Sequence, residues 1–213
     1  LSGEVNIIMN HIFTNCTNLQ NINFKYDNFN MLSITDISHM FEGCINLGNV
    51  TLDIDISKIT DMSYLFADCI NLEKVQFNNE SITKTYNMEK MFYNCPKLNS
   101  IILPNFTTTE EINMNSMFQY CSNLTSLDLN NFDSNYIKNI DYMFYECTLL
   151  NSLSLKSKIN ESISMISSFE KCLSLTSLNL SFLSNGTIIN MSKIFSGCNS
   201  LQYIKLSEND GST

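Results

Sequence analysis

The chain has 213 residues, of which 12 are Lys, none is Arg and 21 are acidic, so its net charge is −9 at neutral pH. This acidic balance argues against a nucleic-acid partner and against docking on anionic membrane surfaces, because both need concentrated cationic side chains. No apolar run reaches the roughly 18 residues of a membrane-spanning helix, so we expect no direct membrane insertion in this segment.

An internal repeat is marked by eight cysteines, which recur at intervals of 28, 25, 26, 26, 26, 25 and 26 residues. These are Cys16, Cys44, Cys69, Cys95, Cys121, Cys147, Cys172 and Cys198. A Phe stands three residues before every Cys, and a Leu stands three residues after it. This regularity predicts a single solenoid over residues 1–213 with about eight repeats, rather than a disulfide framework. The longer first interval predicts a small insertion near Asp27 to Met31.

Each repeat begins with a segment whose apolar residues follow the spacing of an amphipathic helix. Counted from the Cys, apolar residues recur at positions −7, −4, −3 and 0. Position −8 is Asp, Asn or Ser in seven of the eight repeats, and such side chains cap the free amides of helix starts. We therefore expect short helices over residues 8–16, 36–44, 61–69, 87–95, 113–121, 139–147, 164–172 and 190–198.

A short strand follows each predicted helix. Positions +3, +6 and +8 are apolar, as in Leu124-Thr-Ser-Leu127-Asp-Leu129, so alternate residues point in and out. The expected strands cover residues 19–24, 47–52, 72–77, 98–103, 124–129, 150–155, 175–180 and 201–206, and polar return loops connect the repeats. Because one helix and one strand cannot bury their apolar faces alone, the coils must stack. The fold class is therefore an α/β solenoid, with a parallel β-sheet on one face and short helices on the other.

The run Asn-Met-x-x-Met-Phe-x-x-Cys-x-x-Leu-x-x-Leu-x-Leu, clearest over residues 113–129 and 190–198, resembles the BspA-like leucine-rich repeats of microbial surface proteins. The resemblance extends from Met9 to Leu206. It implies a right-handed leucine-rich-repeat coil stack in a secreted or surface-anchored protein involved in adhesion or host contact. Residues 1–8 look like the tail of a preceding coil and neither end has a polar capping unit, so we expect a segment of a longer chain.

We interpret the cysteines as reduced, buried core residues, because free Cys packs as a small hydrophobic side chain. Zinc sites need clustered ligands, and no two cysteines are closer than 25 residues in the sequence. His11 and His39 share position −5, which we interpret as chance occupancy of an exposed column rather than a metal-binding pair. No nucleophile stands beside a matched base, so we expect neither an enzyme nor a metal or cofactor site.

Two surfaces are candidates for binding. The exposed strand positions, predicted to line a concave face, are Asn49, Thr51, Lys74, Gln76, Ser100, Ser126, Asp128, Ser152, Ser154 and Ser177. The exposed side of four successive predicted helices carries Tyr64, Tyr93, Tyr120, Tyr142 and Tyr145. These rings form a convex patch suited to packing against a partner. The alternative interpretation is that they only rest over the shoulder of each helix.

Nine Asn-x-Ser/Thr sequons are candidates for N-glycosylation in a chain secreted from a eukaryote. The best acceptors, in predicted return loops, are Asn79, Asn105, Asn160 and Asn185. The weaker acceptors are Asn15, Asn49, Asn123, Asn179 and Asn190.

Three classes of function remain open. The first is a non-enzymatic extracellular or cell-surface protein that mediates adhesion or recognises a protein or glycan. The second is a structural subunit that stacks head to tail on other copies of itself to form extracellular filaments. The third is an intracellular interaction scaffold, which is compatible with eight reduced thiols.

Overall fold

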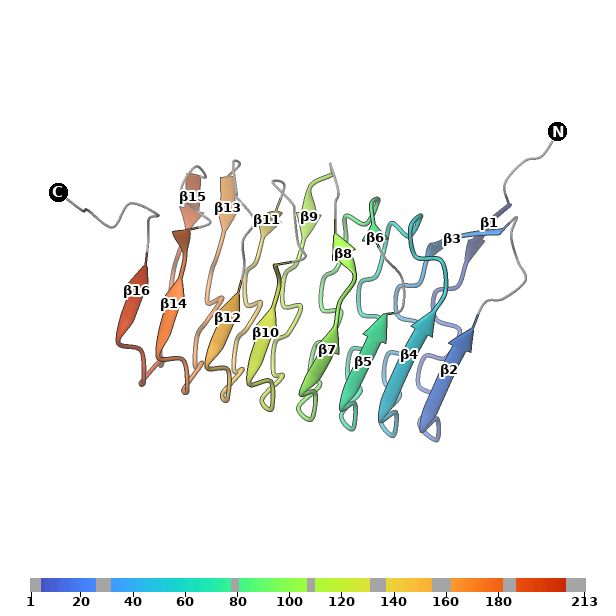
Figure 1. Cartoon of the computed structure of the whole chain (residues 1–213), viewed down its shortest axis with the longest axis horizontal. Coiled ribbons are helices and arrows are strands. Elements are labelled where there is room, and N and C mark those ends of the chain that lie inside the picture. The colour runs from blue at the N-terminus through green and yellow to red at the C-terminus, as the bar shows by residue number, and fades with distance from the viewer. Residues whose placement is uncertain are drawn as a thin grey trace.

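The computed structural model describes residues 5–25, 32–77, 81–106, 110–130, 137–154, 162–181 and 187–205, which form a parallel β-solenoid (Figure 1). Successive coils lie side by side along one axis, so each coil contacts the coil before it and the coil after it. The predicted insertion near Asp27 to Met31 lies outside the described residues.

One face of the solenoid carries the strands that the alternating apolar pattern predicts. These strands are β2 (Asn21–Lys25), β4 (Asn49–Asp53), β5 (Lys74–Phe77), β7 (Ser100–Ile102), β10 (Ser126–Asp128), β12 (Ser152–Ser154), β14 (Ser177–Asn179) and β16 (Tyr203–Lys205). Strands β2, β4, β5 and β7 pair in parallel, as do β10 with β12 and β14 with β16. The pairing aligns equivalent positions, so that Asn49 lies opposite Lys74 and Lys74 lies opposite Ser100. The strand prediction is confirmed.

A second set of parallel strands runs along another side of the solenoid, where the sequence predicts return loops. It consists of β1 (Val5–Ile8), β3 (Leu32–Asp36), β9 (Ile112–Asn113), β11 (Ile137–Asn139), β13 (Ser162–Ser164) and β15 (Thr187–Asn190). Single bridges through Asp36, Asp61, Asn87 and Asn113 connect β3 to β9. A smaller pair is formed by β6 (Ser81–Ile82) and β8 (Asn105–Phe106). These strands bury isoleucines such as Ile112 and Ile163, and the neighbouring coil satisfies their backbone hydrogen bonds.

The predicted short helices are wrong: none of the described residues is α-helical, and the predicted helix segments form turns. Two residues of each repeat, at positions −5 and −1, have a left-handed backbone conformation, which a right-handed helix cannot accommodate. Those at −5 are His11, His39, Tyr64, Lys90, Ser116, Tyr142, Ser167 and Lys193. Those at −1 are Asn15, Gly43, Asp68, Asn94, Tyr120, Glu146, Lys171 and Gly197.

In the segments predicted to be helices, the backbone amides donate to two kinds of acceptor. The N–H of Cys44 donates to the carbonyl of Phe41 at 3.1 Å, which closes a tight turn. The N–H groups of His39 and Phe41 instead donate to the next coil, to the carbonyls of Ser63 and Leu65, at 2.9 Å each. Coil-to-coil bonding thus replaces the bonds that a helix would form within itself.

The side chains predicted to cap helices make the predicted bond without a helix. Asp36 and Asp61 accept the amide hydrogens of Ser38 and Ser63, two residues further along the chain, at 2.8 Å. Asn139 accepts from Asp141 in the same way at 2.8 Å. This is an Asx turn, which uses the same acceptor and the same spacing as an N-cap.

The core is a set of side-chain columns, one residue per coil. The phenylalanines at position −3 stack as one series from Phe13 to Phe195, with neighbouring ring centroids 5.4–5.9 Å apart. The columns of Cys, Leu and Met beside them are fully buried in the central coils. The side chain of Cys16 is exposed, whereas that of Cys44 in the next coil is buried. The prediction of buried thiols is therefore confirmed for Cys44 through Cys172. The right-handed sense of the coil stays a prediction of the family resemblance.

We predict that replacing Phe118 with Ala lowers the free energy of unfolding by about 3–5 kcal/mol, because it opens a cavity in a rigid stack. Phe118 is 0% exposed and lies between Phe92 at 5.4 Å and Phe144 at 5.6 Å. Urea denaturation followed by circular dichroism measures the change. Ile102→Thr, at a residue that is 49% exposed, is the control. A change within about 0.5 kcal/mol for Phe118→Ala would contradict the assigned core position.

A second prediction concerns Gly43, which occupies position −1 with φ +68°. Gly43→Ala should cost about 1–2 kcal/mol, because a Cβ is unfavourable in the left-handed region. The added Cβ would also meet Oδ1 of Asn15, which must turn away. Gly48→Ala is the matched control, since its nearest atom would be the carbonyl oxygen of Gln20 at 3.8 Å and it has no positive φ. Equal melting temperatures for the two variants would refute the strain argument.

Candidate recognition surface

The strand face brings nine of the ten predicted strand-face residues into two rows, and the tenth, Ser177, pairs with Tyr203. One row pairs Asn49, Lys74 and Ser100 across three coils and continues as Ser126 beside Ser152. The second row places Thr51 beside Gln76 and Asp128 beside Ser154. All ten side chains are exposed or partly exposed, and most are small and uncharged. The concave curvature predicted for this face stays untested.

The turn segments carry a series of rings, called here the aromatic strip, in which Lys90 connects Tyr64 to Tyr93. Its members are His11, His39, Tyr64, Tyr93, Tyr120 and Tyr145. The imidazole of His11 stacks on that of His39 at 4.5 Å, and His39 stacks on Tyr64 at 4.6 Å. Tyr93 and Tyr145 contact Tyr120 edge to face at 5.5 and 5.6 Å. Of these residues, His11, His39, Tyr64 and Tyr120 have the left-handed backbone conformation of positions −5 and −1, whereas Tyr93 and Tyr145 stand at position −2. The tyrosines therefore contact one another across coils and do not lie against a helix.

Two lysines bind the aromatic strip through their ammonium groups. Nζ of Lys90 lies 5.0 Å from the ring centre of Tyr64 and 5.5 Å from that of Tyr93, and it donates to the Tyr64 hydroxyl at 3.0 Å. This hydrogen bond raises the pKa of Lys90. Nζ of Lys171 lies 5.0 Å from the ring centre of Tyr145 and pairs with Glu146 at 2.6 Å. Hydrogen bonds to Glu146 and Tyr145 raise the pKa of Lys171. Both lysines thus place a positive charge over the face of a tyrosine ring.

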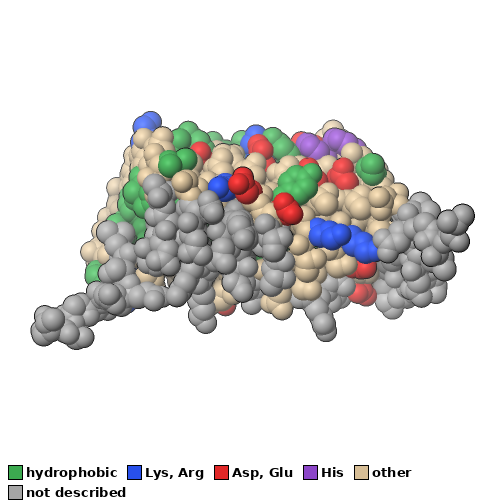
Figure 2. All heavy atoms as spheres, turned by 90° about the horizontal axis from the view of Figure 1, so that it is seen from above, with side chains coloured by type: hydrophobic (Ala, Val, Ile, Leu, Met, Phe, Trp, Pro, Cys, Tyr) green, Lys and Arg blue, Asp and Glu red, His purple; other side chains and the backbone are tan. Residues whose placement is uncertain are grey.

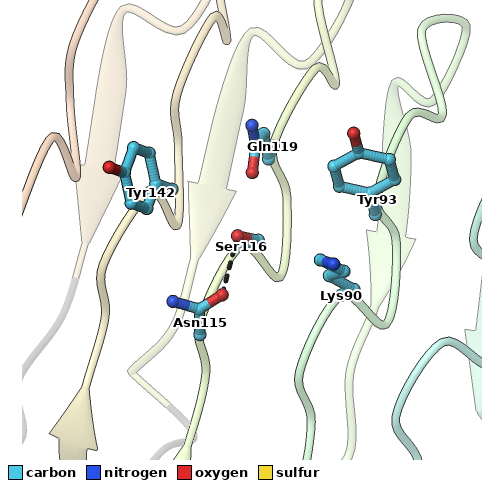
Figure 3. A pocket seen from close by; sticks show the side chains of 6 residues that line it. All are labelled: Lys90, Tyr93, Asn115, Ser116, Gln119 and Tyr142. Carbon is cyan, nitrogen blue, oxygen red and sulfur yellow. Dashed lines mark hydrogen bonds between the residues drawn. The ribbon is translucent and has the colours of Figure 1, made fainter.

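A shallow hollow of about 340 Å³ opens beside the aromatic strip (Figure 3). Its lining residues come from three successive coils and are Lys90, Tyr93, Asn115, Ser116, Gln119 and Tyr142. Figure 3 shows Tyr93 and Tyr142 on opposite sides, with the amide of Gln119 and the Asn115–Ser116 pair between them. The sequence pattern singled out only the tyrosines. The shared positions −5 and −2 in neighbouring repeats could have pointed to Lys90, Ser116 and Gln119.

A second hollow, of about 460 Å³, is lined by Thr60, Thr83, Lys84, Tyr86 and Glu110. It has a single ring, that of Tyr86, which is 46% exposed. Figure 2 views the solenoid from above and shows acidic and basic side chains scattered among polar ones, with the two histidines side by side. The charges on this face are mixed and do not form a patch of one sign.

The cysteines form a column of thiols, none of which is in a disulfide bond. Each thiol from Cys44 to Cys198 donates to the carbonyl of the Phe one coil earlier, as Cys121 does to Phe92 at 3.1 Å. Burial raises the pKa of Cys44 to about 11 and that of Cys121 to about 12. Burial also raises the pKa of Cys69, Cys95, Cys147, Cys172 and Cys198. Thiols kept protonated in this way are poor nucleophiles and poor metal ligands.

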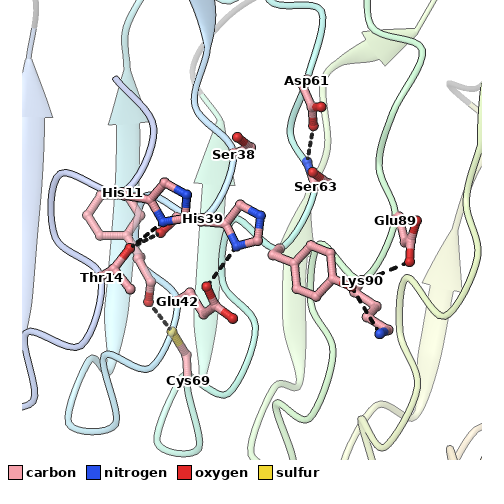
Figure 4. Close-up of polar contacts among 12 residues, drawn as sticks. His11, Thr14, Ser38, His39, Glu42, Asp61, Ser63, Cys69, Glu89 and Lys90 are labelled. Carbon is pink, nitrogen blue, oxygen red and sulfur yellow. Dashed lines mark hydrogen bonds and ion pairs between the residues drawn. The ribbon is translucent and has the colours of Figure 1, made fainter. Parts of the chain in front are cut away.

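His11 and His39, which the sequence did not predict to bind metal, lie beside the carboxylate of Glu42. Nδ1 of His39 is 2.7 Å from Oε2 of Glu42, and the ligand atoms of His11, His39 and Glu42 all lie within 4.8 Å of one another (Figure 4). The signal that could have found Glu42 is its position, three residues after His39, in a column next to the histidine column.

Every sequon asparagine that the structure describes is exposed: Asn15, Asn49, Asn105, Asn123, Asn179 and Asn190. Asn79, Asn160 and Asn185 lie outside the described residues. Exposure permits modification but does not test it, so glycosylation stays a prediction.

Within the described residues, no helix is long and apolar enough to cross a membrane.

The stacked coils, the column of Phe, Cys and Leu, and the repeat length of about 26 residues define a leucine-rich-repeat solenoid protein of the BspA-like type. The chain belongs to the family described as "Mycoplasma protein of unknown function, DUF285", whose model matches residues 7–122 and 73–182.

Solved structures of similar fold come from bacterial leucine-rich-repeat proteins. The chain is similar to a leucine-rich cell surface protein from Faecalibacterium prausnitzii, with a TM-score of 0.60 and 20% identity over 88% of this chain and 47% of that one. It thus spans about half the length of that protein. A leucine-rich repeat protein of T. pallidum matches with a TM-score of 0.45 and 18% identity, over 87% of this chain and 68% of that one. A leucine-rich repeat protein from Bacteroides ovatus matches with a TM-score of 0.37 and 19% identity, over 94% of this chain and 64% of that one. No curated protein matches significantly.

The thiol column makes stability depend on pH in the alkaline range. Because burial raises the folded-state pKa of Cys121 to about 12, its contribution is complete below the unfolded-state pKa of about 8.5 and is lost as the pH rises towards 12. We predict that the free energy of unfolding falls between about pH 8 and about pH 10, by up to about 1.4 kcal/mol per pH unit for this thiol.

Urea denaturation under reducing conditions at several pH values measures the effect. Cys121→Ala should lower the stability at neutral pH, and its free energy of unfolding should fall less steeply with pH, by up to about 1.4 kcal/mol per pH unit. Identical slopes for the wild type and the variant would show that this thiol is not the protonated, buried group described here.

Proposed function

We propose that this chain is part of a non-enzymatic cell-surface leucine-rich-repeat protein that recognises an extracellular glycan in the hollow beside the aromatic strip. The observation that carries the proposal is the pair of rings, the partly exposed Tyr93 and the exposed Tyr142, on either side of the polar groups of Asn115, Ser116 and Gln119. A protein ligand, and a role in adhesion, belong to the same class of recognition function.

The chemistry of the hollow favours a neutral sugar over other ligands. Tyrosine offers an apolar ring face together with a hydroxyl, which suits a ligand with apolar C–H faces and many hydroxyl groups. The amides of Asn115 and Gln119 and the ammonium group of Lys90 supply both donors and acceptors between the rings. Pockets that combine aromatic walls with a few polar groups are typical ligand sites. Protein hot spots favour Trp and Arg as well as Tyr, and this chain contains neither of them.

An extracellular location is supported by two observations. The BspA-like repeats resemble those of microbial surface proteins, and the F. prausnitzii protein of similar fold is described as a cell surface protein. The net charge of −9 argues against nucleic acid as the partner. The intracellular scaffold is the less favoured alternative, although the unbonded thiols are compatible with it.

Head-to-tail assembly into filaments is a second candidate function. Core side chains are less covered in the first and last described coils: Cys16 is exposed, and Phe13, Phe195 and Cys198 are only partly buried. A further coil, from the same chain or from another copy, would cover them, because equivalent positions in the central coils are buried. Sedimentation and electron microscopy at increasing concentration distinguish a filament from a particle.

The glycan proposal predicts that binding to an array of immobilised oligosaccharides depends on Tyr93 and Tyr142. The double variant Tyr93→Ser/Tyr142→Asn should lose at least about tenfold in affinity, since aromatic anchors dominate recognition sites. Asn is chosen at position 142 because it tolerates the left-handed backbone found there. Tyr86→Ser is the matched control for removing an exposed ring elsewhere.

A third variant, Lys74→Ala/Gln76→Ala, tests the strand face. Loss of binding in this variant alone would move the site to the strand face. Binding to immobilised proteins but to no oligosaccharide would replace the glycan by a protein ligand.

A further inference from the structure

We propose that His11, His39 and Glu42 form a binding site for a divalent transition-metal ion, zinc by its donor set, that links two adjacent coils. Two imidazoles and a carboxylate are a ligand set that zinc uses, with a fourth position left for water. The three residues are the only such group among the described part of the chain. The sequence contains no histidine apart from these two.

The fold brings the two histidines together because they occupy the same position in neighbouring coils. Both residues adopt the left-handed conformation, with φ of 57° and 56°, so their side chains leave the backbone in the same direction. The rings stack at 4.5 Å with an interplanar angle of 17° (Figure 4). The coil-to-coil hydrogen bond from the His11 amide to the Ser38 carbonyl, 3.2 Å long, fixes their register.

Glu42 supplies the third ligand from the turn that follows His39. Its Oε2 lies 2.7 Å from Nδ1 of His39, so that an Nδ1–H proton can donate a hydrogen bond to the carboxylate. A metal ion can replace this proton, so that binding would release it to solvent. The side chains of His39 and Glu42 are 27% and 28% exposed, which leaves them open to an ion from solution.

Neighbouring groups hold these ligands near a binding geometry. Tyr64 stacks on the face of His39 away from His11, at 4.6 Å, and Lys90 in turn holds the Tyr64 hydroxyl at 3.0 Å. Thr14 is 3.3 Å from Nδ1 of His11 and donates its own hydrogen bond to the carbonyl of His39 at 2.7 Å. Partners that orient a ligand in this way raise metal affinity.

The remaining adjustment is small. Ligand atoms about 2.0–2.2 Å from a tetrahedral ion lie roughly 3.3–3.6 Å apart, whereas those of this group lie within 4.8 Å. Binding would need the ligand atoms of His39 and Glu42, now 2.7 Å apart, to separate slightly and the exposed His11 side chain to rotate towards them. The bound ion would then cross-link the coil of Cys16 to the coil of Cys44, beside the end of the hydrophobic core.

Titration of the purified protein with Co²⁺, followed by competition with Zn²⁺, tests this site. We expect one tetrahedral Co²⁺ per chain, seen as visible d–d absorption, and no thiolate-to-cobalt charge-transfer band. Zn²⁺ should displace it and should raise the melting temperature. His11→Asn, His39→Asn and Glu42→Gln should each weaken binding by on the order of tenfold or more. Asn is used because it tolerates the left-handed backbone at these positions.

Glu170→Gln is the matched control, since Glu170 occupies the position of Glu42 in a coil without histidine and should leave the affinity unchanged. Circular dichroism in chelator establishes that each variant is folded before titration. Cobalt binding that survives in the double variant His11→Asn/His39→Asn would overturn the proposal. A thiolate charge-transfer band that Cys16→Ser abolishes would also overturn it, because the exposed Cys16 would then be the ligand.

Discussion

Hydrogen bonding between successive coils is the constraint on which the rest of this structure depends. In the turn segments, alternate amides donate to the carbonyls of the following coil, as Phe41 does to Leu65 and Phe66 does to Met91. A coil isolated from its neighbours would leave these groups without partners, at a cost that a small segment cannot offset. Stacking also places equivalent side chains directly above one another, so the Phe column and the thiol column are consequences of the same bonding pattern.

The same constraint explains why surface side chains form rows. A residue type repeated at one position produces a ladder, such as the asparagine-to-aspartate bonds Asn87 to Asp61 at 3.0 Å and Asn94 to Asp68 at 2.7 Å. Rings at positions −5, −2 and −1 produce the aromatic strip by the same mechanism. Recognition surfaces in this fold are thus built by substitution within columns, and the backbone need not change.

Left-handed residues are the structural cost of this arrangement. Each repeat places two of them in the turn segment, and only Gly43 and Gly197 avoid a Cβ there. Longer side chains at these positions, such as those of Tyr142 and Lys171, are exposed and lie clear of the buried Phe and Cys columns. Binding groups such as Tyr142 and the histidines stand at these strained positions. Local strain in this protein therefore coincides with its candidate sites.

The sequence alone determined the period, the stacked core of Phe, Cys and Leu, and the strands at Asn49–Asp53 and its equivalents, because each rests on a local spacing of apolar residues. It also identified the tyrosines and the Asx acceptors such as Asp36. Only the tertiary structure decided between helix and turn. Apolar residues at −7, −4, −3 and 0 are compatible with a helix and with a turn. The two differ in whether the backbone amides donate within their own segment or to the next coil. The hollow between Tyr93 and Tyr142 and the meeting of His11, His39 and Glu42 likewise join residues of different coils, whose proximity follows from the stacking and not from any local pattern.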